Sequence, residues 1–203
     1  MPESEGEGVV TWYGLVMDIS QRKALEQKLV KLSMTDELTG LYNRRYLFER
    51  LTDLLEEKHR HQVPFSLVQV DLDWFKSIND SYGHLMGDEV LKAFSSTLRQ
   101  RLRRGDIAGR TGGEEFLILL PHTNAQTAAE LIDVIREVFM QTQFQSNAQE
   151  LFQVSFSAGV TSVCDRDKQL DDLLARADAA LYGAKRLGRN QVAIDDPTAG
   201  GND

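Results

Sequence analysis

Hydrophobic side chains recur every three or four residues in four segments of the chain, which is the spacing of an amphipathic helix. This pattern predicts helices over residues 43–58, 87–103, 124–141 and 170–186. In the second segment, for example, Leu91, Phe94 and Leu98 fall on one face. Gly188 follows the fourth segment, where a glycine commonly ends a helix because it takes left-handed backbone angles without strain.

Shorter apolar stretches between these helices predict strands. They cover residues 65–72, 107–110, 116–120, 152–160 and 191–194. Gly112 and Gly113 separate the second stretch from the third and predict a tight hairpin, since both glycines can take positive φ. Residues 152–160 alternate strictly between apolar and polar, which predicts a strand with one buried face.

The predicted elements follow one another as helix, strand, helix, hairpin, helix, strand, helix and strand. A sheet that contains a hairpin and packs against helices is typical of the α+β class. Ahead of these elements, residues 9–19 have the composition of a short strand, and Leu25, Leu29 and Leu32 recur at helical spacing. That helix either starts a coiled coil or packs on its own domain. The polar tail at 196–203 is predicted to be disordered.

Composition narrows the range of functions. The chain has 203 residues, of which 31 are acidic and 23 basic, so its formal net charge is −8. Nucleic acid does not suit an acidic chain as a partner, because phosphate backbones are bound by basic surfaces. The single cysteine excludes a disulfide framework and a zinc cluster, and no apolar run approaches ~20 residues, the length that crosses a bilayer. We therefore expect a cytoplasmic domain without membrane contact.

Acidic residues cluster at the predicted ends of strands. Asp71 and Asp73 fall where the 65–72 strand stops, and Glu114 and Glu115 come directly after the Gly-Gly turn. If the hairpin pairs beside the first strand, Asp71 and one glutamate would share a hard cation such as Mg²⁺. The alternative is that these carboxylates are solvated or cap strand ends. Neighbouring strand residues point to opposite faces, so Glu114 and Glu115 are expected to differ in role.

Basic residues gather where the last predicted helix ends. Lys185, Arg186 and Arg189 lie within five positions of the sequence. One interpretation is that they complement the helix dipole and the last carbonyl groups. The other is that they bind phosphate together with Lys76.

Together these segments resemble the GGDEF family of diguanylate cyclases over about residues 34–194. The motifs that carry the resemblance are Gly-Gly-Glu-Glu-Phe at 112–116, Asp-Glu-Leu-Thr-Gly-Leu-Tyr-Asn-Arg-Arg at 36–45, Asp-Leu-Asp-Trp-Phe-Lys-Ser-Ile-Asn-Asp at 71–80, Gly83-His84, Gly87-Asp88 and residues 185–189. Glu114 stands where the family name has Asp and keeps the carboxylate.

The resemblance implies a fold similar to class III nucleotidyl cyclases and polymerase palms: a central, mostly antiparallel, five-stranded sheet surrounded by helices, here over residues 36–195. It implies that two GTP molecules condense into cyclic di-GMP and two pyrophosphates, when the 3′-hydroxyl of one attacks the α-phosphate of the other. Two metal ions per half-site, Mg²⁺ or alternatively Mn²⁺, would stabilise the entering and leaving oxygens. Each domain would bind one GTP, so catalysis requires a homodimer.

The resemblance also implies catalytic and metal-binding roles. Asp71 and Glu114 would hold the metal ions through their side chains, and Leu72 through its backbone carbonyl. Glu115 would complete the acidic cluster, either on metal or near the attacking hydroxyl.

For GTP, the resemblance implies binding by Phe75, Lys76, Asn79, Asp88, Gly112, Gly113, Lys185 and Arg189. Asn79 and Asp88 would recognise guanine, whose N1–H and amino group donate to a carboxylate. The Phe75 amide and the basic members would bind the β- and γ-phosphates. The two glycines let phosphates approach the backbone closely.

An Arg-x-x-Asp motif at 103–106 is similar to the product-inhibition site of the family. Arg103 would then bind the guanine and phosphate of cyclic di-GMP, and Asp106 would accept from a guanine edge. The alternative is that the two side chains only pair with each other at a helix end.

Residues 14–23 resemble the last strand of a PAS sensor where it continues into a signalling helix. This implies that residues 1–20 end an upstream sensor domain, that 21–35 form a signalling-helix linker, and that a longer protein can be attached to a membrane upstream. The family usually controls biofilm formation and motility.

Other functions stay open as alternatives. A catalytically silent module would bind GTP or cyclic di-GMP, although such relatives lose a metal carboxylate or the glycine pair, and this chain keeps both. A cyclase acting on ATP is disfavoured, because adenine offers Asp88 no N1–H donor. A domain that only dimerises leaves Lys76, Asn79 and Asp88 unexplained.

Overall fold

The computed structural model describes residues 18–19, 34–146 and 148–195, and it divides the chain into Met1–Ser33 and Met34–Asp203. The strand predicted at 9–19, the linker at 21–35 and the tail at 196–203 fall wholly or almost wholly outside the described residues. The helices of the second unit are α2 (Arg44–His61), α3 (Phe75–Tyr82), α4 (His84–Arg101), α5 (Ala125–Met140) and α6 (Leu170–Arg186). The strands are β1 (Tyr42–Asn43), β2 (Phe65–Leu72), β3 (Ile107–Arg110), β4 (Glu115–Pro121), β5 (Phe144–Gln145), β6 (Leu151–Phe152), β7 (Phe156–Ser162) and β8 (Val192–Asp195).

The main sheet has the order β1-β3-β4-β2-β7-β8. Its four inner strands pair antiparallel, and β1 and β8 add parallel edges. The α+β class and the mostly antiparallel sheet are therefore confirmed, but the sheet has six strands rather than five. The extra strand, β1, pairs with Gly109 and Arg110, and a Cβ on Gly109 would collide with the carbonyl oxygen of Tyr42.

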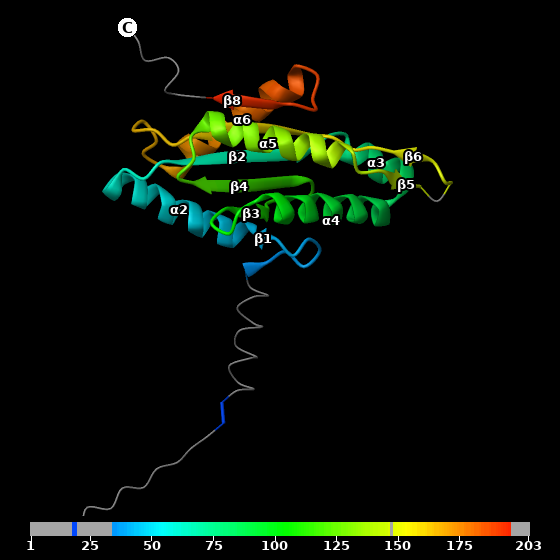
Figure 1. Ribbon diagram of the computed structural model, residues 1–203, viewed down its shortest axis with the longest axis horizontal. Helices are drawn as coiled ribbons and strands as arrows, with labels where there is room; N and C mark the ends of the chain where they lie inside the picture. The colour runs from blue at the N-terminus through cyan, green and yellow to red at the C-terminus, as the bar shows by residue number, and fades with distance from the viewer. Residues whose placement is uncertain (1–17, 20–33, 147, 196–203) are drawn as a thin grey trace, which may run out of the picture. The chain divides into compact units, whose positions relative to one another are not determined.

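Both faces of this sheet are covered by helices. In Figure 1 the long strands β2 and β4 lie next to each other, and α4 and α5 run along them rather than across. One core contains Val68 and Val70 of β2 with Phe94 of α4 and Ile132 of α5, and the other contains Leu67 with residues of α2 and α6. Because each face has its own core, β2 is buried on both sides, as its apolar sequence predicts.

The prediction for residues 152–160 is wrong in two respects. The stretch divides into β6, which pairs with β5 in a separate small sheet, and β7, which joins the main sheet. In addition, β7 is buried on both faces because α6 packs on its second face. Gly159 permits that packing, since a Cβ there would collide with the backbone of Ala177 and Leu181 in α6.

The four predicted helices agree with the structure to within three residues at each end. Asn43 and Asn124 cap α2 and α5, and their side chains accept from the backbone N–H groups of Tyr46 and Thr127. Gly188 follows α6 with φ of +118°, as the sequence predicts. However, α4 begins three residues earlier than residue 87, and α3 was not predicted. None of the helices in the described part of the chain is long and apolar enough to cross a membrane.

Candidate functional site

Strand register brings the predicted acidic residues to one end of the sheet. Asp71 of β2 lies directly opposite Glu115 of β4. One residue further, the Leu72 N–H donates to the carbonyl oxygen of Glu114 at 3.2 Å. The hairpin therefore pairs beside the first core strand, which was the condition for these carboxylates to meet.

The charges of this cluster act on one another. Burial raises the pKa of Glu114, and the negative charges of Asp71 and Glu115 raise it further, whereas the ammonium of Lys185 lowers it. Lys185 lies against Asp71, with 2.7 Å between its Nζ and Oδ2. Within the described residues, no three Asp, Glu, His or Cys side chains converge closely enough to enclose a metal ion. Two facing carboxylates and a nearby backbone carbonyl are nevertheless the hard oxygen donors that Mg²⁺ prefers.

The two glycines of the hairpin do not take left-handed backbone angles, and Gly112 instead provides space for a neighbouring side chain. The hairpin is closed by the Glu115 carbonyl, which accepts from the Thr111 N–H at 2.9 Å. Neither Gly112 nor Gly113 has φ in the left-handed region, so the prediction that the pair takes positive φ is wrong. Instead, a Cβ on Gly112 would collide with the Glu115 carboxylate, which folds back over the turn. Glycine at 112 thus leaves room for the Glu115 carboxylate in this position.

Arg110 fixes the turn and was not predicted from the sequence. Its guanidinium donates to the carbonyl oxygens of Gly112 at 3.0 Å and Gly113 at 2.7 Å. Its Nη1 lies 3.4 Å from Asp36 Oδ1, in the motif at 36–45. Burial acts to raise the pKa of Asp36, but hydrogen bonds from Thr39 and the charge of Arg110 outweigh it and hold the pKa below its usual value. Arg110 thereby joins two motifs that lie far apart in the sequence.

The residues predicted to recognise guanine lie where α3 and α4 pack together. Asn79 is on α3, and Asp88 is in the first two turns of α4. A Cβ on Gly87 would collide with Asn79 Oδ1 and would lie 3.1 Å from Phe75 Cζ, so this glycine leaves room for the Asn79 side chain in its present position. The Phe75 side chain is buried in the core, which leaves only its backbone available to a ligand.

The predicted phosphate ligands surround the turn between β2 and α3. Lys185 lies beside Asp71, and the Arg189 guanidinium stacks 4.0 Å from the ring centroid of Trp74. Lys76, at the start of α3, is exposed. Arg186, in contrast, lies over Tyr182 at 5.9 Å. Lys185 and Arg189 are therefore placed to contact a ligand held by the acidic end of the sheet, which a role limited to the helix dipole does not require.

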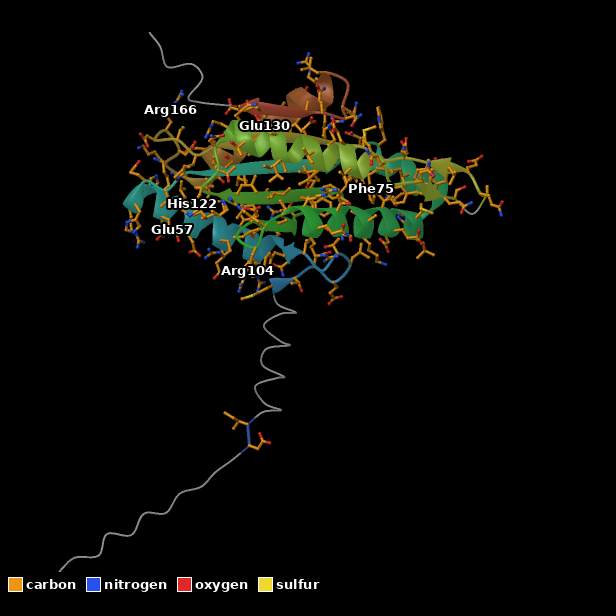
Figure 2. The ribbon with its side chains drawn as sticks, in the orientation of Figure 1. Glu57, Phe75, Arg104, His122, Glu130 and Arg166 are labelled. Atoms are coloured by element: carbon orange, nitrogen blue, oxygen red, sulfur yellow. The ribbon has the colours of Figure 1, made fainter. Side chains whose placement is uncertain are left out.

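Arg103 and Asp106 lie at the other end of the sheet. Figure 2 shows Phe75 at one end of the strands, and the neighbouring Arg104 together with His122 toward the opposite end. β4 has seven residues, which separate the two ends by about 20 Å. Arg103 Nε lies 2.9 Å from Asp106 Oδ1, and its Nη2 donates to the Pro121 carbonyl at 2.6 Å. The two side chains pair, yet the Arg103 side chain remains 60% exposed and open to a ligand.

Comparisons with known proteins agree with this arrangement. Residues 33–191 match the family described as "Diguanylate cyclase, GGDEF domain". Diguanylate cyclase DgcP of Pseudomonas aeruginosa is 40% identical over 80% of this chain and 24% of its own length. A diguanylate cyclase of Vibrio cholerae is 37% identical over 92% of this chain and 57% of its own length. The chain thus spans between a quarter and somewhat over half the length of these two relatives.

Solved structures give the same picture. The diguanylate cyclase SiaD of Pseudomonas aeruginosa, in complex with its activator SiaC, has 38% identity and a TM-score of 0.78 over 86% of this chain and 66% of its own. The coiled coil and GGDEF domain of DgcB from Caulobacter crescentus, in complex with c-di-GMP, has 29% identity and a TM-score of 0.80 over 86% of this chain and 92% of its own.

Proposed function

Because this chain belongs to the GGDEF family of diguanylate cyclases, we propose that it condenses two molecules of GTP into cyclic di-GMP and releases two pyrophosphates. One observation carries the proposal. Asp71 and Glu114 come from the ends of neighbouring strands and lie close enough that the charge of Asp71 raises the pKa of Glu114, with Lys185 beside them. Carboxylates in that arrangement repel unless a cation is shared, which suits a site that takes up metal-bound triphosphate.

Asp71, Glu114 and the Leu72 carbonyl would hold two Mg²⁺ ions per half-site, and Glu115 would complete the acidic set. When bound, these ions lower the pKa of the attacking 3′-hydroxyl and stabilise the leaving pyrophosphate. The exposed position of Glu115 at the first residue of β4 also leaves it free to face the attacking hydroxyl.

The other ligands of GTP come from the remaining predicted residues. Asn79 and Asp88 hold guanine at the contact between α3 and α4, where Gly87 removes the steric barrier. The β- and γ-phosphates lie against the Phe75 amide and the ammonium of Lys76, with Lys185 and Arg189 neutralising their charge. The chain offers each of these groups once, so two copies face each other to bring two nucleotides together, and the active form is a homodimer.

The proposal includes product inhibition at Arg103 and Asp106. The exposed guanidinium of Arg103 is available to guanine and phosphate, while the Asp106 side chain is 2% exposed and holds it in place. Related GGDEF domains are described in complex with c-di-GMP, which supports binding of this ligand class. We further propose that residues 1–20 end an upstream sensor, that 21–35 link it to the catalytic domain at 36–195, and that the domain acts in the cytoplasm.

Incubation of the protein with GTP and Mg²⁺ tests the proposal directly. Chromatography should resolve cyclic di-GMP and pyrophosphate in a ratio of about one to two, as the balanced reaction requires, and ATP should yield no product. GTP binding without any cyclic di-GMP would instead favour the catalytically silent module. A protein that binds neither GTP nor cyclic di-GMP would refute both the cyclase and the silent binding module.

A further inference from the structure

Asp73 is a buried carboxylate with no part in the roles described above. It is 3% exposed. Its side chain accepts three hydrogen bonds: from Ser155 Oγ at 2.6 Å, Ser157 Oγ at 2.7 Å and the Asn190 backbone N–H at 3.0 Å. A carboxylate is almost never buried unless donors compensate its charge. Through these bonds Asp73 joins the end of β2 to the start of β7 and to the loop between α6 and β8.

The loop between α6 and β8 follows an unusual backbone path. Arg189 and Asn190 have φ of 63° and 47°, in the left-handed region that residues other than glycine rarely adopt. Such a conformation persists where surrounding contacts fix it. Here the Arg189 N–H donates to the Ala184 carbonyl at 3.1 Å, and Asn190 Oδ1 accepts from Arg136 at 3.0 Å. The bond from Asn190 to Asp73 ties the same loop to the turn after β2.

That tie places two neighbouring side chains against each other. Trp74 follows Asp73 in the sequence, and Arg189 precedes Asn190. The hydrogen bond between Asp73 and Asn190 therefore fixes the spacing at which Arg189 stacks over the Trp74 ring, 4.0 Å from its centroid. Trp74 is 64% exposed and has φ of 58°, so its ring is held outward by the backbone. Cation and ring together form one wall of the proposed phosphate site.

We propose that Asp73 is a positioning residue for nucleotide binding, because through Asn190 it holds Arg189 beside Trp74 where Arg189 meets the phosphates. The role of Arg189 as a phosphate ligand rests on the proposed function, whereas its contact with Trp74 does not. Loss of the Asp73 carboxylate releases Arg189 and weakens GTP binding. Asp71 and Glu114 stay in place, because the pairing of β2 with β4 and the hydrogen bond from the Leu72 N–H to the Glu114 carbonyl hold them independently.

The substitution Asp73→Ala, which removes both acceptor oxygens, tests this in a Trp12→Phe background, where Trp74 becomes the sole tryptophan of a chain that has two. The probe is the α,β-methylene analogue of GTP with Mg²⁺, which cannot release pyrophosphate, and calorimetry measures its affinity. We expect about tenfold weaker binding, which is typical for loss of one charged hydrogen bond. We also expect the nucleotide-free emission of Trp74 to change, because Arg189 no longer covers the ring.

A double variant separates positioning from general damage. Asp73→Ala combined with Arg189→Ala should bind the analogue no more weakly than Arg189→Ala alone, since both changes remove the same contact. Ser155→Ala removes one of the three donors and should shift affinity and emission in the same direction by less, which keeps a test available if Asp73→Ala does not fold. Asp165→Ala, at an exposed aspartate, is the matched control and should change neither.

Two outcomes would overturn the proposal: additive losses of affinity in the double variant, or unchanged Trp74 emission in folded Asp73→Ala and Ser155→Ala. If the parent protein with only Trp12→Phe does not bind the analogue, the proposed function fails. The emission measurement then still decides whether Asp73 holds Arg189 against Trp74.

Discussion

The two ends of the main sheet differ in how fully their carboxylates are paired with cations. At the end where β2 stops and β4 begins, Asp71 lies opposite Glu115 with Glu114 next to it, and Lys185 is the cation that contacts Asp71. Negative neighbours and burial raise the pKa of Glu114 there. The local charge is therefore unbalanced in the ligand-free protein.

At the opposite end, where β7 stops and β8 ends, each carboxylate has its cation. Arg176 of α6 donates to Asp167 at 2.7 Å and to Asp195 at 3.0 Å. Arg176 also donates to the Thr161 hydroxyl and to the Ser162 carbonyl, and these two residues end β7. Asp167 is 1% exposed, so its charge is compensated almost wholly by protein groups.

The two ends of the sheet should respond differently to substitution. A buried charge that is fully paired holds elements together, and removing one partner is costly. Carboxylates that repel one another do not stabilise the fold, and their presence indicates that a ligand completes the balance. The acidic end is therefore expected to lose activity on substitution, and the Arg176 end to lose stability.

Replacement of Glu114 by Gln, at the acidic end, should have the largest effect of the substitutions considered. We expect turnover of GTP to fall by at least about 10³-fold, because a carboxylate that stabilises the transition state is lost. Stability should move the other way. A raised carboxyl pKa stabilises the fold below the usual pKa and loses that contribution as pH rises through the raised value, so charged Glu114 lowers stability at neutral pH.

Urea unfolding of the metal-free protein at neutral pH should therefore show Glu114→Gln to be more stable than the parent. Glu57→Gln, at an exposed position of α2, is the control and should change neither activity nor stability. A less stable Glu114→Gln variant would show that repulsion among the carboxylates does not destabilise the acidic end. The expected difference in stability effects between the two ends of the sheet would then be absent.

Replacement of Arg176 by Leu should produce the largest effect at the other end. Asp167 would keep its burial and lose its cation, which should lower the free energy of unfolding by about 3 kcal/mol. Turnover of the remaining folded protein should be unchanged, since Arg176 and the acidic residues occupy opposite ends. Asp195→Asn is the matched variant and should cost less, because Asp195 is 43% exposed. Equal losses from both variants would contradict the role assigned to burial.

The sequence predicted elements well where an apolar stripe coincided with a cap. The helix at 170–186 and the strand at 65–72 have their predicted bounds. The short helix α3 was missed because its buried hydrophobic residues are limited to Phe75 and Ile78, too few to define a period. The error at 152–160 has another origin: alternation describes one strand, whereas burial of its polar face depends on α6, which lies elsewhere in the sequence.

For the candidate site, local patterns predicted which residues lie at strand ends but missed those that connect distant segments. Asp73 bonds to Ser155 and Asn190, which lie 82 and 117 positions further along the chain. Arg110 bonds to backbone carbonyls, which every residue possesses. Neither partnership leaves a pattern in the sequence. Gly112 was recognised for the wrong reason, because a collision with the Glu115 side chain is visible only in three dimensions.

Arg103 is paired with a carboxylate, as Arg176 is, but its side chain is much more exposed. If its exposed face binds product, Arg103→Ala should weaken cyclic di-GMP binding by at least about tenfold, as expected for loss of a charged hydrogen bond. Calorimetry of the protein with cyclic di-GMP and EDTA measures this without turnover. Arg104→Ala is the neighbouring control and should retain binding. Undiminished binding by Arg103→Ala would make the Arg103–Asp106 pair structural, as at Arg176.

The smallest effect is expected at Asp36, which balances Arg110 behind the acidic end. The pKa of Asp36 is lowered in the folded protein, since bonds from Thr39 and the charge of Arg110 outweigh burial. A lowered carboxyl pKa adds stability above the unfolded value of 3.8, and that contribution disappears as pH falls through the folded value. Asp36→Asn should therefore lose about 1 kcal/mol at neutral pH. Unfolding measured in urea from neutral to acidic pH should show the parent and the variant converge on acidification, and a constant difference would mean that the Asp36 charge contributes nothing.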